Sequence, residues 1–156
     1  MFSIRSRCLL LVSLLLLCIS APAQTTCPWL TQGTAATWLQ GPVTVSTNLL
    51  SANEGTCTFT LHQDNALYTL EITVSATNHP RCPASSKPLT GIGNEAILCA
   101  ANPSRNQTTD TITSRICDRY LTVQLTITAK NTNPMPPDQR QAIVQQAAEE
   151  VAGNLY

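Results

Sequence analysis

The side chains with the widest chemical range in this sequence are five cysteines that lie beyond residue 23. A thiol can form a disulfide, ligate a metal ion or act as a nucleophile. Five is an odd number, so at least one thiol has no partner within this set, and the arithmetic leaves fifteen ways of forming two disulfides. No C-x-x-C pair occurs, so we predict no metal site. The five are Cys27, Cys57, Cys82, Cys99 and Cys117.

Cys117 stands between two arginines, and a carboxylate lies in a Gly-Asn-Glu-Ala segment upstream of them. The guanidinium groups of Arg115 and Arg119 are candidates for holding an anionic ligand. A carboxylate in a tight turn, such as that of Glu95, can accept backbone N–H groups or contact a ligand. Arg119 would also favour a thiolate at Cys117. We favour structural roles for Glu95 and Cys117, and keep Glu95, Arg115 and Arg119 as candidate ligand-binding residues.

The sequence contains two histidines that could act as general bases. His62 follows a strand-like run and His79 lies in a long loop, and neither adjoins a nucleophile motif such as G-x-S-x-G. The glycines of Gly91-Ile92-Gly93 do not complete a phosphate-binding pattern. We therefore predict a protein that is not an enzyme and needs no cofactor. A small hydrolase that uses His79 is the alternative.

The amino-acid composition limits the classes of partner that this protein could bind. The chain has 156 residues, nine basic and nine acidic, and 43% of its residues are hydrophobic. Residues 24–156 carry seven basic and nine acidic side chains, a net charge of −2. A general nucleic-acid binder needs a basic stripe, which this charge balance does not supply. We expect one domain over residues 24–156 whose partner is a small molecule or an envelope protein.

The first 23 residues have the three parts of a secretory signal peptide. Arg5 and Arg7 form a positive region, Leu9–Ile19 forms an apolar stretch of 11 residues, and Ala21-Pro22-Ala23 supplies small residues for cleavage. A membrane span needs about 17–25 apolar residues, more than this stretch provides. The pattern therefore predicts export rather than a membrane anchor.

We expect cleavage after Ala23 and a protein that is secreted or periplasmic, with no membrane span in residues 24–156. A lipid anchor at Cys18 is the less favoured alternative, because the large Leu17 stands directly before the cysteine, where lipid attachment signals have a small residue. Export brings the chain into an oxidising compartment, where disulfides are the default state of cysteines. A thiol left unpaired there could link two copies into a disulfide-bonded dimer.

Hydrophobic periodicity predicts a helix at each end of residues 24–156. Thr31 is a candidate N-cap for a short helix to about Gln40, which Gly41-Pro42 would end. Apolar residues recur at i+4 from Ile143 through Ala147 to Val151, which indicates an amphipathic helix after Pro137 with Gly153 as its terminator.

Between the helices, alternation of apolar and polar residues predicts strands. The clearest runs are 57–61 and 68–74, which form a hairpin around Asp64-Asn65, and 121–127. Residues 96–101 and 112–116 are shorter candidates, and residues 43–47 alternate only weakly. Residues 77–94 are expected to form a long loop and residues 102–110 a polar one. The fold class is therefore α+β: a two-layer sandwich with an antiparallel sheet of four to five strands and both helices packed on one face.

The order of several short segments resembles a group of small exported bacterial proteins and lipoproteins of unknown function. The resemblance covers nearly all of residues 24–156, and it implies an exported bacterial domain without implying an activity. The segments that carry it are Cys27 with its short helix, Gly41-Pro42-Val43, Cys57-Thr58-Phe59, Leu70-Glu71-Ile72-Thr73-Val74, Cys82, Gly91-Ile92-Gly93-Asn94-Glu95-Ala96, Cys99, Arg115-Ile116-Cys117-Asp118-Arg119-Tyr120 and Glu149-Glu150-Val151-Ala152-Gly153-Asn154-Leu155.

The resemblance also implies a disulfide pairing. It favours Cys27–Cys57 and Cys82–Cys99, with Cys117 left as a free thiol. Reasoning from the residues leaves a rival open: a hairpin around Asn106 would place Cys99 beside Cys117, and these two would then pair.

Overall fold

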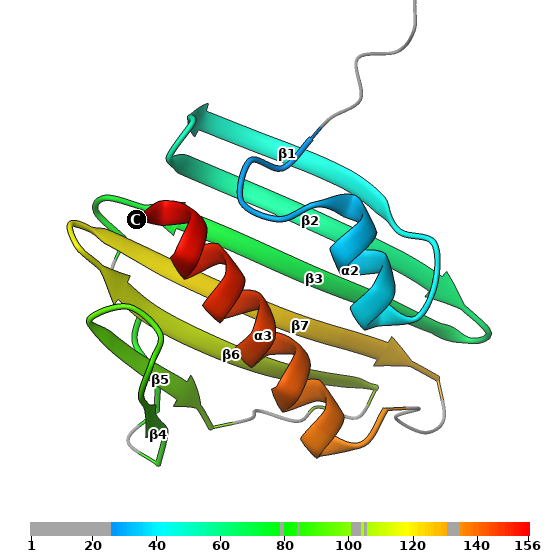
Figure 1. The fold of residues 1–156 in the computed structure, drawn as a ribbon. Coiled ribbons are helices and arrows are strands. Elements are labelled where there is room, and N and C mark those ends of the chain that lie inside the picture. Colours follow the sequence, from blue (N-terminus) through cyan, green and yellow to red (C-terminus); the bar gives the residue numbers. More distant parts are fainter. Residues whose placement is uncertain (1–25, 79, 84, 101–103, 105, 131–134) are drawn as a thin grey trace, which may run out of the picture.

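The computed structural model describes residues 26–78, 80–83, 85–100, 104, 106–130 and 135–156. Two helices and seven strands lie within these residues (Figure 1). In chain order they are α2 (Gln32–Leu39), β1 (Thr44–Ser51), β2 (Glu54–Gln63), β3 (Ala66–Ser75), β4 (Lys87–Leu89), β5 (Glu95–Cys99), β6 (Gln107–Ile116), β7 (Arg119–Ala129) and α3 (Pro137–Leu155). The α+β class is confirmed, but the expected four to five strands are too few.

The sequence pattern underestimated the number of strands because parts of three strands carry little apolar alternation. β1 is a sheet edge whose residues are exposed or half-buried, so it shows little apolar alternation. β4 has three residues and includes Pro88, and it lies inside the segment that we expected to be a loop. β6 begins at Gln107, where a run of polar residues hid the start of the strand.

The strands form one antiparallel sheet in the order β1-β2-β3-β7-β6-β5-β4. β1 to β3 make one meander and β4 to β7 another, and they join where β3 pairs with β7. Tight turns set the register: Gln63 faces Ala66 across the β2–β3 turn, and Ile116 faces Arg119 across the β6–β7 turn. The expected hairpin around Asp64-Asn65 is therefore confirmed.

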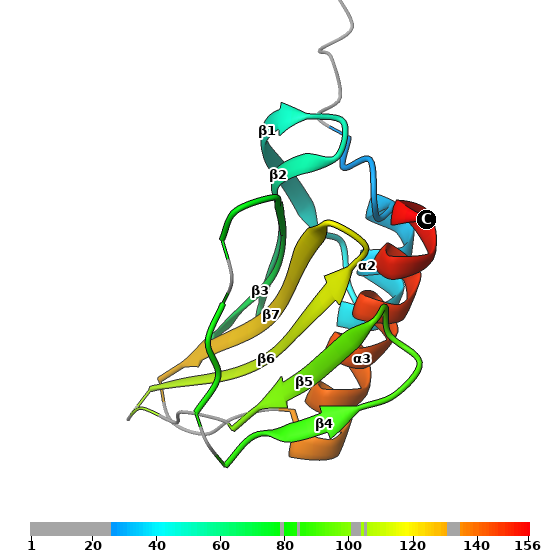
Figure 2. The same ribbon diagram turned by 90° about the vertical axis from the view of Figure 1, so that its left-hand side faces the viewer.

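The two faces of the sheet differ in chemistry. Both helices cover one face (Figure 2), and the apolar residues of each central strand point into the core beneath them. Phe59, Leu70 and Leu125 are aligned across three strands and are fully buried. The opposite face, called the outer face below, carries threonines in register, for example Thr60, Thr69 and Thr126. Threonine is a good strand residue that keeps such a face wettable.

α2 begins and ends close to the residues that the sequence predicted, but a different residue forms its C-cap. The Thr31 side chain accepts a hydrogen bond from the Thr34 N–H at 3.0 Å, which caps the first turn. At the other end, Gln40 and not Gly41 takes the left-handed conformation, with φ of 61°. Gly41 does not have a left-handed backbone, and a Cβ there would lie 2.8 Å from the end of the Leu61 side chain, so the residue packs closely against Leu61.

α3 packs one stripe against β6 and β7. Pro137 occupies its first turn, where no N–H is required. The helix continues through Gly153 to Leu155, so the predicted terminator is wrong. The Asn154 side chain donates a hydrogen bond to the Trp29 carbonyl at 2.9 Å, which ties this last turn to the start of the domain. The buried side chains are Arg140, Ile143, Val144, Ala147, Ala148, Val151 and Ala152.

Arg140 is a charged residue in this buried stripe. Its Nε donates to Asp110 Oδ2 on β6 at 2.5 Å, and its Nη1 donates to the Met135 carbonyl at 2.9 Å. The arginine and aspartate side chains are only 7% and 2% exposed. A charge buried to this degree is tolerated because it is paired and hydrogen-bonded. The pair therefore fixes the first turn of α3 to the sheet.

Two disulfides are present, and they are the pair that the resemblance implied. Cys27–Cys57 joins the start of the domain to β2, with 5.8 Å between the Cα atoms. The rival Cys99–Cys117 pairing is wrong, because Cys99 faces Thr111 in the β5–β6 register. Cys117 lies six residues beyond Thr111, directly after the end of β6, which is about 20 Å away at the rise of a strand. It is free and exposed.

Tyr68 on β3 is nearly buried, with 7% of its surface exposed. Burial, with a smaller contribution from the nearby negative charge of Asp64, raises the pKa of the Tyr68 hydroxyl above its ordinary value of 10.0. Both effects disfavour the phenolate. The folded protein therefore favours the neutral hydroxyl form of Tyr68.

Candidate functional site

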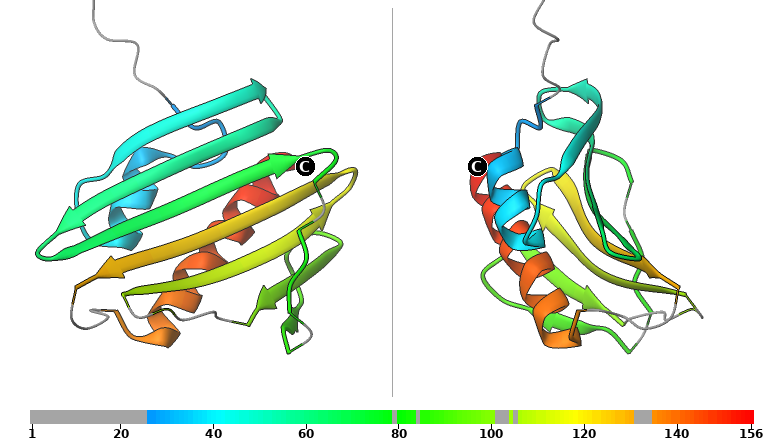
Figure 3. Two further views of the ribbon diagram at one scale, coloured as in Figure 1. Left: turned by 180° about the vertical axis from the view of Figure 1, so that it is seen from behind. Right: turned by 90° about the vertical axis from the view of Figure 1, so that its right-hand side faces the viewer.

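The β3–β4 connection passes over the outer face of the sheet at β5 and β6 (Figure 3). A shallow groove lies there, between this connection and the two strands. Its volume is about 400 Å³, within the range of small-molecule sites. Prolines and Ile97 supply its apolar surface, and one threonine, one serine and one arginine supply polar groups. The lining residues are Pro80, Arg81, Cys82, Pro83, Ser86, Pro88, Ile97 and Thr113.

Two bonds hold the wall of this groove against the sheet. The Cys82–Cys99 disulfide joins the connection to the end of β5, with 5.0 Å between the Cα atoms. Ser86 Oγ accepts a hydrogen bond from the Ala100 N–H at 2.9 Å. Cys82 Sγ also lies 3.5 Å from the Thr113 hydroxyl on β6. The connection that forms one side of the groove is therefore attached to the sheet by a disulfide and a hydrogen bond.

A smaller cleft of about 30 Å³ continues the groove along β5 and β6. It shares Pro80, Ile97 and Thr113 with the groove, and it brings in Glu95, Arg115 and Tyr120. We call the groove and this cleft together the β5–β6 groove. Two of the three residues predicted to bind a ligand therefore lie at one end of a real hollow.

The charges in that cleft neutralise each other. Arg115 Nη2 lies 3.1 Å from Glu95 Oε1, across adjacent strands. The two side chains are 46% and 67% exposed, so the pair contributes about 0–1 kcal/mol to stability. Because the guanidinium already has a carboxylate partner, this end of the groove presents little net charge to a ligand.

The segment before Glu95 has a structural role that sequence reasoning did not find. The Asn94 side chain accepts a hydrogen bond from the Cys117 N–H at 2.7 Å, and the Asn94 N–H donates to the Arg115 carbonyl at 2.7 Å. Gly93 has φ of 62°, and a Cβ there would lie 2.6 Å from the Arg115 carbonyl oxygen. Gly93 and Asn94 thus clamp the β6–β7 turn.

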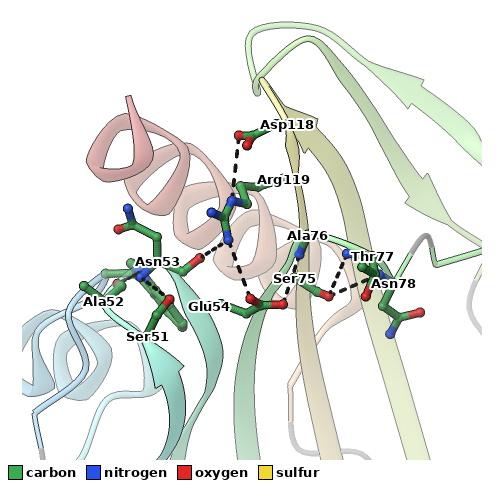
Figure 4. Close-up of polar contacts among 11 residues, drawn as sticks. Ser51, Ala52, Asn53, Glu54, Ser75, Ala76, Thr77, Asn78, Asp118 and Arg119 are labelled. Carbon is green, nitrogen blue, oxygen red and sulfur yellow. Dashed lines mark hydrogen bonds and ion pairs between the residues drawn. The ribbon is translucent and has the colours of Figure 1, made fainter.

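Arg119 has separate partners at the end of the sheet (Figure 4). Its Nη1 donates to the Asn53 carbonyl at 3.3 Å and lies 3.8 Å from Glu54 Oε2, and its Nε lies 3.7 Å from Asp118 Oδ1. Glu54 Oε1 in turn accepts the Ala76 N–H at 3.2 Å. Arg119 therefore joins the β1–β2 turn, the end of β3 and the β6–β7 turn.

The structure does not bring the two candidate arginines together. Arg115 pairs with Tyr120 across β6 and β7, so strand alternation directs the next residue, Arg119, to the other face. Each guanidinium has a carboxylate partner of its own. An anion held jointly by Arg115 and Arg119 is therefore not supported by this geometry.

The histidines lie apart from the β5–β6 groove or outside the described residues. His62 lines a different hollow of about 280 Å³, together with Asp64, Lys130 and the end of β7. His79 is not among the described residues. Within the part of the chain that the structure describes, no three His, Cys, Asp or Glu side chains gather into a possible metal site. In the same residues, no helix has the length and apolar character to cross a membrane.

Comparisons with known proteins add little. No protein-family model and no curated protein matches the chain. Among solved structures, the crystal structure of Ara h 8.0201 aligns with 8% sequence identity over 80% of this chain and 81% of that chain. Its TM-score of 0.27 is too low to carry an argument about fold or function. Function is therefore inferred from the geometry of the site alone.

Proposed function

We propose that this protein is a non-catalytic binding module of the bacterial cell envelope, exported after cleavage at Ala23, whose ligand contacts the β5–β6 groove. The proposal rests on one observation: a groove of about 400 Å³ lies beneath the β3–β4 connection, and the Cys82–Cys99 disulfide attaches this connection to β5. A site held in this way binds with a small loss of conformational entropy. The two disulfides also suit an oxidising compartment.

The lining indicates the chemistry of the ligand. Ile97 is a 40% exposed hydrophobic residue on a face that is otherwise rich in threonine. Prolines flank it, and the nearby Arg115 is paired with Glu95. The groove therefore suits a partly apolar ligand whose polar end can lie beside Arg81, either a small molecule or a side chain of an envelope protein.

A second candidate function rests on Cys117. Its thiol is exposed, has no disulfide partner and lies in the tight β6–β7 turn. A turn that projects from the end of a sheet presents its thiol to other molecules. This favours a structural or redox role through an intermolecular disulfide. A non-reducing gel that shows a doubled mass, collapsing on reduction, is the expected result of this alternative.

The groove is tested with an uncharged fluorescent apolar probe, N-phenyl-1-naphthylamine, titrated into the exported protein. We expect saturable fluorescence enhancement and a loss of affinity of tenfold or more in Ile97→Lys. Leu49→Lys is the matched control, because Leu49 is equally exposed but lies on β1, at the other edge of the sheet. Equal binding by both variants, or no binding by the unmodified protein, would refute an apolar site in the groove.

Native mass spectrometry of the exported protein then separates the two kinds of ligand. A retained small mass identifies a bound small molecule. A co-purifying protein that Ile97→Lys releases and Gln141→Lys, on the exposed side of α3, retains identifies a protein partner. If the unmodified protein has a hydrolytic activity that substitution of His62 or His79 abolishes, the hydrolase alternative is favoured over a binding module.

A further inference from the structure

The two edges of the sheet are protected to very different degrees. β4 has three residues and carries Lys87 and Pro88, a charge and a missing N–H that discourage pairing with another strand. β1 has eight residues, none of them charged or proline. The edges lie on opposite sides of the molecule (Figure 1). An edge strand as long and uncharged as β1 is a template for pairing.

The register shows which groups of β1 are unpaired. A two-residue turn makes Gln63 and Ala66 a hydrogen-bonded pair, so alternate residues of β2 from Gln63 back to Gly55 bond to β3. The remaining residues of β2 bond to β1, and they face Thr44, Ser46 and Asn48. The backbone N–H and C=O groups of the intervening residues therefore point away from the sheet. These residues are Val45, Thr47 and Leu49.

We propose that β1 pairs antiparallel with β1 of a second copy of this chain, about a two-fold axis at Thr47. In this register, Val45 of each copy lies opposite Leu49 of the other, on the face that the helices cover. On the outer face, Ser46 lies opposite Asn48. The apolar residue that is 40% exposed in the monomer, Leu49, thus gains an apolar neighbour.

Charge and geometry favour a second copy over another partner. Antiparallel self-pairing places a strand opposite its own sequence, and β1 has no charge to repel itself. The register shift between Leu49 and Ser51 ends the regular strand, so pairing is confined to residues 45–49. Three hydrogen-bonded positions, each exchanging two bonds, give about six hydrogen bonds. Because the β4 edge is blocked, the assembly closes at two copies instead of growing into a fibre.

The test is sedimentation velocity of the exported protein over a wide concentration range, in a Cys117→Ser background that cannot form a disulfide-linked dimer through this exposed thiol. We expect a reversible monomer–dimer equilibrium. Thr47→Pro removes an outward N–H that has no partner among the residues that the structure describes, and Ser46→Lys/Asn48→Lys places like charges opposite each other. Each change is expected to weaken dimerisation at least tenfold. Gln141→Lys/Gln146→Lys, with the same charge change on the exposed side of α3, is the matched control.

Hydrogen exchange locates the interface independently of the variants. The amides of Val45, Thr47 and Leu49 are expected to gain protection as protein concentration rises. A protein that stays monomeric at every concentration, or dimers that both β1 variants leave intact, would overturn the proposal. So would a monomer whose β1 edge is protected only when a different protein co-purifies with it.

Discussion

Removing the carboxylate of the buried Asp110–Arg140 pair should destabilise the fold strongly. Asp110→Ala leaves the Arg140 guanidinium, 7% exposed, with only the Met135 carbonyl as its acceptor in the described structure. Breaking one partner of a buried ion pair costs about 3–5 kcal/mol, which is a large share of the about 5–15 kcal/mol that stabilises a typical domain. The loss follows from stranding a charge in a site that excludes water.

The exposed Glu95–Arg115 pair is the matched comparison. At 3.1 Å it is also within hydrogen-bonding distance, as the buried pair is, but its side chains are 67% and 46% exposed. Glu95→Ala should therefore cost about 0–1 kcal/mol, because water solvates the arginine that remains. The two substitutions thus isolate burial as the cause of the difference.

The assay is equilibrium unfolding in urea, followed by the fluorescence of the two tryptophans. With a slope of about 2 kcal/mol per molar urea, the expected loss for Asp110→Ala lowers the midpoint by about 1.5–2.5 M. If the single variant does not fold, Asp110→Leu/Arg140→Met removes both charges and should recover most of the stability. An Asp110→Ala midpoint as close to that of the unmodified protein as the Glu95→Ala midpoint would refute this reasoning.

Four further predictions follow from local geometry. Cys117→Gly should raise stability by about 1 kcal/mol in urea unfolding, because the residue has φ of 53° and glycine bears no Cβ penalty there. Gly93→Ala should lower it by about 1–3 kcal/mol in the same assay, since a left-handed backbone would then carry a Cβ against a carbonyl. Replacing Cys82 and Cys99 with alanine should cost about 3 kcal/mol and weaken probe binding in the groove. The raised pKa of Tyr68 contributes stability that is fully present below pH 10 and is lost as pH rises through the folded-state pKa, so unfolding scans at alkaline pH should show a smaller loss in Tyr68→Phe.

The fold was predictable where a strand is long and buried on one side. The alternation of β3 and β7 fixed both strands and their faces, and the turn at Asp64-Asn65 fixed a hairpin. The edges were not predictable in the same way, because β1 and β4 lack a buried face or lack length. The disulfides came from the resemblance, since the arithmetic of five cysteines allowed fifteen arrangements.

The buried Asp110–Arg140 pair was missed for a different reason. Asp110 follows four polar residues and was assigned to a loop, and Arg140 stands one turn into a helix whose first residues are polar. Nothing local distinguishes Asp110 from a solvated side chain, because its pairing with Arg140 depends on where α3 docks across β6. One signal was present: Arg140 precedes Ile143, Val144 and Ala147 at spacings of three, four and seven, which places it on the buried stripe.

Only part of the candidate site was predicted, because closeness in sequence does not show which face of a strand a residue lies on. Glu95 and Arg115 were grouped because of their residue types, and the β5–β6 pairing brings them together. Arg119 was grouped with them because it is close in sequence, but one step along a strand reverses the face. The groove itself depends on a segment of prolines held by a disulfide, and its apolar residue, Ile97, gave no signal of exposure in the sequence.

The two proposed surfaces are compatible because they lie on opposite edges of one sheet. Pairing through β1 would place β4 and β5 of each copy at the outer ends of a continuous sheet, far from the shared edge. The β5–β6 groove would then stay open in both copies, and a dimer would present two equivalent sites to a repeating or multivalent partner. Such a dimer gains avidity only if both sites can be engaged at once. Thr47→Pro should therefore leave binding of the monovalent probe unchanged while it weakens attachment to any partner that carries several copies of the ligand.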